Sequence, residues 1–107
     1  MTATLDPRVK AANIKAAARN LAEAAARLEC IESQINDLAH VERPSAARFA
    51  RLCTLRFKRS AAERTERSAL HAAHRAGLED LQEYLTELDG QPVYVFLDGP
   101  CVSLFSD

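Results

Sequence analysis

Hydrophobic residues recur every seven positions along the first third of the chain. The first set is Ile14, Leu21, Leu28 and Ile35, and the second set, three residues later, is Ala17, Ala24, Ile31 and Leu38. This spacing over four heptads predicts a long helix that packs along one seam against another helix. Asp6 and Pro7 supply a cap and a favoured first position, and Pro44 forbids continuation. We place this helix at about residues 7–42, a length of roughly 54 Å.

The region from residue 45 to residue 89 is also predicted to be helical. It contains no proline and no glycine before Gly77, and both residue types disfavour helix interiors. Its strongest apolar repeat is formed by Leu78, Leu81, Leu85 and Leu88. Gly90 then suits the left-handed position that ends a helix. The short connection at residues 43–45 indicates that the two helical regions fold back antiparallel.

The polar middle of this second region leaves alternatives open. Ser60 and Glu63 have the spacing of a capping box, which would begin a new helix near residue 61. One long helix, which we slightly prefer, and two helices broken near residue 59 both fit. A third alternative makes residues 52–58 a strand, because apolar residues alternate there.

A β-hairpin is predicted at about residues 92–106. Residues 93–97 are apolar, residues 101–105 are nearly so, and the two runs flank an Asp98-Gly99 turn signal. Two strands this apolar should not face water on either side. One face can lie on the helices, and the other needs a cover from a second copy, a foreign partner or the strand at 52–58. The predicted fold is therefore mainly α (α+β), a single domain over residues 1–107.

Charge is segregated along the chain, although the formal net charge is only −1. Residues 28–42 hold four acidic and no basic residues, and residues 43–67 hold eight basic and two acidic residues. In an antiparallel hairpin these two blocks lie side by side, so our favoured interpretation is intramolecular compensation. The alternative is nucleic-acid binding by an arginine-rich helix. Its candidate residues are Arg48, Arg51, Arg56, Lys58, Arg59, Arg64 and Arg67.

No motif for catalysis, a cofactor or a metal is evident in the sequence. Its three glycines form no phosphate loop. His71 and His74 share a predicted helix face, but two ligands do not make a metal site. The three cysteines match no ligand or disulfide pattern. No segment resembles a signal peptide or a membrane span. We therefore expect a cytoplasmic protein that is not an enzyme, with no cofactor, metal or membrane partner.

These features favour a small protein-binding module, an inhibitor or regulator of another protein. The candidate contact residues lie in the apolar hairpin: Tyr94, Phe96, Val102 and Leu104. Phage anti-defence proteins such as anti-CRISPRs, and antitoxins, fall in the same size class, and size is the only basis for naming them. A homodimer is expected, because the heptad seam and the hairpin leave apolar surface uncovered. A homodimeric scaffold is a further alternative.

Overall fold

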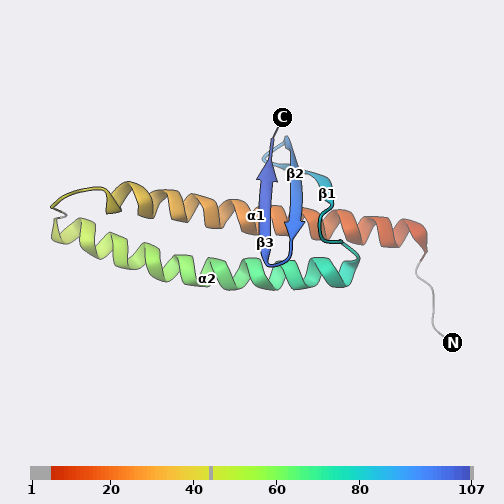
Figure 1. Ribbon diagram of the computed structural model, residues 1–107, viewed down its shortest axis with the longest axis horizontal. Coiled ribbons are helices and arrows are strands. Elements are labelled where there is room, and N and C mark those ends of the chain that lie inside the picture. The colour runs from red at the N-terminus through yellow and green to blue at the C-terminus, as the bar shows by residue number, and fades with distance from the viewer. Residues whose placement is uncertain (1–5, 44, 107) are drawn as a thin grey trace.

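The computed structural model describes residues 6–43 and 45–106, which form two long helices followed by a three-stranded antiparallel sheet (Figure 1). The elements are α1 (Pro7–Ala39), α2 (Ala46–Ala76), β1 (Glu83–Leu88), β2 (Gln91–Asp98) and β3 (Cys101–Phe105). The helices form an antiparallel hairpin, and the sheet order is β1-β2-β3. This confirms the predicted fold class of a helical hairpin followed by a C-terminal β-hairpin.

Helix α1 begins where the sequence predicts. The Asp6 side chain accepts a hydrogen bond of 2.8 Å from the Arg8 amide, and Pro7 occupies the first turn. The helix ends at Ala39, slightly before the predicted residue 42. Its heptad seam is the buried side of the helix, with Leu21 wholly inaccessible and Ile31 and Ile35 also buried.

Helix α2 is one continuous helix from Ala46 to Ala76. The preference for a single helix over a break near residue 59 is therefore confirmed. The alternative prediction of a strand at residues 52–58 is wrong. The Ser60 hydroxyl does not cap a new helix, because it donates to the Arg56 carbonyl one turn earlier (3.3 Å). The helix ends at Gly77, whose φ of +110° is favourable only for glycine.

The predicted extension of the second helix to residue 89 is wrong. Leu78 follows the Gly77 cap and packs into the core, and β1 begins at Glu83. Asp89 and Gly90, with φ values of +51° and +78°, form the two-residue loop between β1 and β2 rather than a helix end. Positive φ at both central positions is the conformation whose twist matches that of a β-hairpin.

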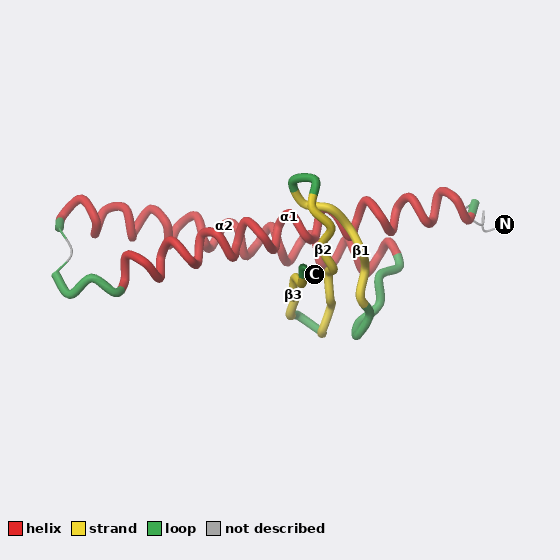
Figure 2. Tube along the Cα trace, turned by 90° about the horizontal axis from the view of Figure 1, so that it is seen from above, coloured by secondary structure: helices red, strands yellow, loops and turns green. Residues whose placement is uncertain are grey.

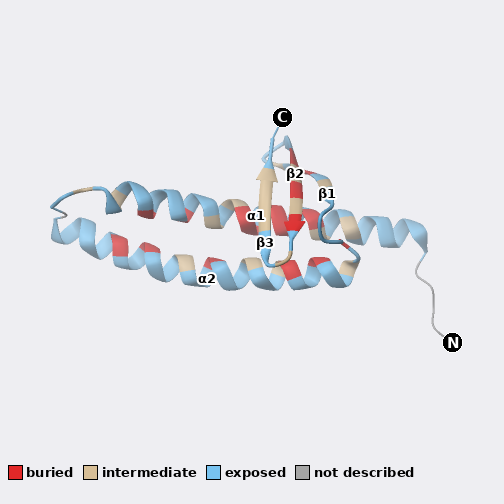
Figure 3. Cartoon of the chain, in the orientation of Figure 1, coloured by how far each residue is buried: buried red, intermediate tan, exposed pale blue. Residues whose placement is uncertain are grey.

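The sheet lies on one side of the helical pair, and its strands run across the helices (Figures 1 and 2). Its inner face contributes Val93, Val95 and Leu97 from β2, which are all buried. The cluster that joins the sheet to both helices consists of Ala18, Leu21, Ala22, Leu70, Ala73, Leu78, Val95 and Leu97. A second, smaller cluster lies farther along the hairpin, toward the loop between the helices, as Figure 3 shows.

No helix in the described part of the chain has the length and apolar character needed to cross a membrane.

Candidate interaction surface

The outer face of the sheet carries a row of apolar side chains. Alternation along β2 directs Val95 to the core and Tyr94 to the other side. The strand register places Leu85, Tyr94 and Phe105 opposite one another across all three strands. Leu85 is 58% exposed and Phe105 is 52% exposed, while Tyr94 and Phe96 are half-buried against their neighbours. We call Leu85, Tyr94, Phe96 and Phe105 the outer row.

The charged side chains that the strands carry on this face of the sheet are all carboxylates, and the uncharged Pro92, Cys101 and Ser103 share the face. Glu83 and Glu87 flank Leu85 on the same side of β1, and Asp98 follows Phe96 on the same side of β2. No Lys, Arg or His follows Arg75 in the sequence. The surface is therefore apolar at its centre and acidic at its rim, a polarity that favours a basic partner.

The structure divides the four predicted contact residues between the two faces of the sheet. Tyr94 and Phe96 belong to the outer row. Val102 and Leu104 lie on the inner face, where they pack against the core cluster as partly buried residues. The sequence missed Leu85 and Phe105. The available signal for Phe105 was the alternation of side chains along β3, which places Phe105 on the face opposite to Val102 and Leu104.

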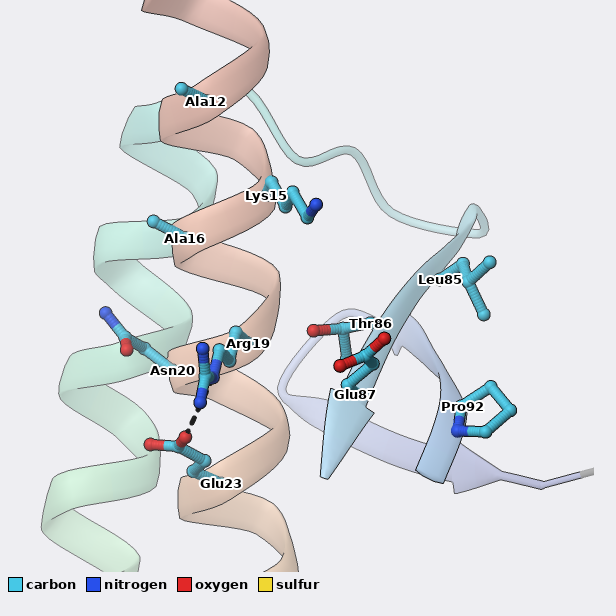
Figure 4. Close-up of a pocket in the computed structure, with 10 residues that line it drawn as sticks. All are labelled: Ala12, Lys15, Ala16, Arg19, Asn20, Glu23, Leu85, Thr86, Glu87 and Pro92. Atoms are coloured by element: carbon cyan, nitrogen blue, oxygen red, sulfur yellow. Dashed lines mark hydrogen bonds and ion pairs between the residues drawn. The ribbon is translucent and has the colours of Figure 1, made fainter. Parts of the chain in front are cut away.

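A groove of about 720 Å³ lies between α1 and β1, beside the outer row (Figure 4). Small side chains, Ala12 and Ala16, line its helical wall. Lys15 extends from α1 toward the strand, and Arg19 is held by an ion pair of 3.2 Å to Glu23. Leu85 and Pro92 also line the groove. The groove is therefore continuous with the outer face of the sheet.

The seven predicted nucleic-acid-binding residues all lie on α2. Six of them are exposed, and Arg59 is half-buried with an ion pair of 3.7 Å to Glu63. Their spacing distributes them around the helix, because successive residues are rotated by about 100°. They therefore do not form a single stripe. Two aromatic residues in the same segment, Phe49 and Phe57, are 58% and 76% exposed.

Ion pairs in the described part of the chain are all local. They join Arg19 to Glu23 and Arg59 to Glu63, and a contact between His74 and Asp80 becomes ionic when the histidine is protonated. Within residues 6–43 and 45–106, no ion pair within 4.0 Å connects α1 to α2. Compensation between the acidic and basic blocks thus has no direct contacts in this part of the molecule, and the basic side chains at the start of α2 are available to other partners.

Four glutamates instead gather where the two helices pass the end of the sheet. Burial raises the pKa of Glu66, and the neighbouring carboxylates of Glu32, Glu29 and Glu63 raise it further. Glu66 also lies close to the turn between β2 and β3, since it lines a hollow together with Pro100 and Cys101. Like charges at this place oppose folding at neutral pH.

We expect Glu66→Gln to stabilise the protein at about pH 7 by on the order of 0.5 kcal/mol, because it removes one charge from the cluster. The folded-state pKa of Glu66 lies above its usual value of 4.5. The folded protein therefore binds more protons than the unfolded chain between these two values, and stability falls as pH rises through that window. The gain should shrink as the pH falls through 4.5 and vanish well below it, where the carboxyl is protonated in both states.

Denaturant unfolding at about pH 7 and pH 4 measures this effect. Glu83→Gln is the matched control, because Glu83 is exposed and lies on the sheet away from the cluster. A gain for Glu66→Gln that is equal at both pH values would contradict the assigned cause.

The histidines and cysteines form no assembled centre in the described part of the chain. His74 Nε2 lies 3.1 Å from Asp80 Oδ1, and residues 6–43 and 45–106 contain no group of three or more metal-binding side chains. Cys30, Cys53 and Cys101 are free and exposed. The outer sheet face, its groove and the basic start of α2 are therefore the surfaces that bear on function.

The chain was compared with models of protein families, with curated proteins and with solved structures. No family model matches it, and no curated protein or solved structure matches it at a significant level.

Proposed function

We propose that this chain is a non-enzymatic protein-binding module that regulates or inhibits another protein by covering part of its surface. The observation that carries the proposal is the outer row, which places Leu85 and Phe105 in solvent beside two further aromatic residues. An antiparallel sheet that packs one face on a core normally presents polar residues on the other. Exposed apolar patches rimmed by polar groups mark interaction sites.

The composition of this face supports the proposal. Tyr and Phe are enriched at the centres of protein interfaces because they bury large areas with few rotatable bonds. The acidic rim formed by Glu83, Glu87 and Asp98 can select a partner by charge and orient its approach. The groove beside β1 adds a concave region to the same surface. We also propose a cytoplasmic location, since three free and exposed cysteines suit a reducing compartment.

Retention of a partner by the tagged protein tests the proposal. From a nuclease-treated lysate of its host cell, we expect the wild-type chain to retain a protein at fixed stoichiometry. The double variant Leu85→Ser/Phe105→Ser should weaken this retention by about tenfold or more, because it removes the two most exposed members of the outer row. The two substitutions lie on the solvent face, so the circular-dichroism spectrum should not change.

Val9→Ser is the control for this experiment. Val9 is 46% exposed on α1, outside the sheet and its groove. It should retain the partner as the wild-type chain does. Equal retention by the double variant and by Val9→Ser would show that the outer row is not the contact surface.

A further inference from the structure

We propose that the outer row docks on the first half of α2 of a second copy of this chain. In the resulting dimer each chain makes this contact with the other, and a twofold axis relates the two contacts. The inference goes beyond the proposed function, because it assigns the same sheet face to a second copy, which would compete with a foreign partner for the outer row. Three features of the structure support it: charge, apolar surface and the side of the hairpin on which both surfaces lie.

The charges of the two surfaces are opposite and are not compensated by ion pairs. The strands of the sheet present Glu83, Glu87 and Asp98 and no basic residue, and Lys15 and Arg19 of α1 line the groove beside β1. Between Ser45 and Ala62 the sequence contains five basic residues and no acidic one. Of these five, only Arg59 has an ion pair within 4.0 Å in the described part of the chain. Complementary potentials of this kind steer association and fix register.

Both surfaces also expose apolar side chains that lack a cover. Phe49 is 58% exposed at the start of α2, which is comparable with Leu85 and Phe105 on the sheet. An aromatic ring set among arginines is a suitable counterpart for an aromatic row set among carboxylates, because burial of the rings removes apolar area from water. The salt dependence of the contact then comes from its charged rim.

The two surfaces lie on the same side of the helical hairpin. Leu70 belongs to the core cluster under the sheet, so its side of α2 faces the sheet. Arg56 and Phe49 precede Leu70 by two and three heptads, and residues seven apart lie near one line along a helix. The sheet covers only part of the hairpin and leaves this line open toward the loop between the helices (Figure 1).

This arrangement allows a closed dimer. When two surfaces of one molecule face the same side, a twofold axis between them brings each surface against its counterpart on the second copy, so the contact is made twice. The glutamate cluster at Glu29, Glu32, Glu63 and Glu66 lies between the sheet and the basic start of α2. Its charge repels an acidic sheet and thereby favours the register in which the sheet meets Phe49 and Arg56.

Sedimentation equilibrium of the purified, nuclease-treated chain tests the inference. We expect a dimer at low salt whose dissociation constant rises about tenfold or more at roughly 0.5 M NaCl, where exposed charges are screened. Arg48→Glu/Arg56→Glu and Glu83→Lys/Glu87→Lys should each weaken the dimer by about tenfold or more. The four substitutions combined should restore association to within about threefold of wild type, because complementarity returns with exchanged signs.

Arg8→Glu/Arg27→Glu is the charge-matched control, because both residues are exposed on α1, outside the proposed contact. Circular dichroism confirms that every variant is folded. A monomer at all concentrations, or a dimer that neither charge reversal weakens, would overturn the inference. Salt-sensitive binding of a DNA or RNA duplex by a monomeric chain, lost in Arg48→Glu/Arg56→Glu, would overturn it in favour of a nucleic-acid surface.

These outcomes are distinct from failure of the proposed function. A monomeric chain that still retains a foreign protein, and loses it in Leu85→Ser/Phe105→Ser, would refute the second copy and leave the protein-binding module intact. A dimer that forms as proposed, with no foreign protein that depends on the outer row, would support the inference and remove the regulatory role.

Discussion

Replacing Leu97 with alanine is expected to lower the free energy of unfolding by about 3 kcal/mol, within the range found for buried leucines. Leu97 has no accessible surface and belongs to the cluster that joins the sheet to both helices. Alanine would remove apolar contacts and leave a cavity. The cavity would lie between rigid elements that cannot easily close around it, since the strand is fixed on both sides by pairing with β1 and β3.

Urea unfolding followed by circular dichroism measures this loss as a lower midpoint with an unchanged slope. Leu85→Ala is a close control, because it makes the same chemical change on the opposite face of the same sheet, where the side chain is 58% exposed. Its effect should stay within about 0.5 kcal/mol. If the two variants lose similar stability, then the assignment of inner and outer faces is incorrect.

The second large effect is expected from Ala22→Leu, which should destabilise the protein by about 2 kcal/mol through overpacking. Ala18, Ala22 and Ala73 are at most 1% exposed and belong to the cluster between the helices and the sheet. Their small side chains permit the close approach of these elements. Three additional carbon atoms at Ala22 have no free volume to enter, so the elements must separate or the leucine must adopt a strained rotamer.

Thermal unfolding gives the loss as a lower midpoint temperature, compared with Ala11→Leu. Ala11 is exposed on the same helix, and alanine and leucine have similar helix propensities. The control should therefore be close to neutral. A neutral or stabilising Ala22→Leu would mean that the cluster is less tightly packed than the burial of its alanines indicates.

Helix α1 was predictable because several independent signals in its sequence agree. The Asp6-Pro7 start, the heptad of large residues and the stop before Pro44 all specify one element, and its seam is the buried side. When local and long-range preferences agree in this way, the secondary structure of a segment can be predicted from its sequence. The predicted β-hairpin was located for the same reason, since two apolar runs flank a strong turn signal.

Strand β1 was missed because each of its two faces mixes polar and apolar residues. Its core-facing positions are Tyr84, Thr86 and Leu88, so a buried position is polar. Its outward positions include Leu85, which is apolar and exposed. Alternation is therefore absent, and the leucines happen to match a helical period. Gly77 decides the outcome, because a glycine that caps the helix stops it before this repeat begins.

The candidate surface was predictable in part, because the hairpin of β2 and β3 was predicted and strand β1 was not. Tyr94 and Phe96 follow from the apolar hairpin, whose second face had no visible cover. Leu85 could not be assigned to that face, because a residue in a predicted helix is not placed beside Tyr94. The register of three strands brings Leu85 and Phe105 to either side of Tyr94. A hairpin turn sets such a register, and the turn at Asp89-Gly90 was interpreted as a helix end.

The packing of the sheet on α1 also has a consequence for folding. The helices pack on each other and the strands pair with each other, so these contacts join elements that follow directly in sequence. By contrast, the core cluster brings together Leu21 and Leu97, which are separated by most of the chain length. Closing so long a loop costs more entropy than forming a hairpin, so we expect the sheet to dock on α1 late. Until then both faces of the sheet expose apolar side chains to other chains, so we expect this interval to be the one in which the protein is most prone to aggregation.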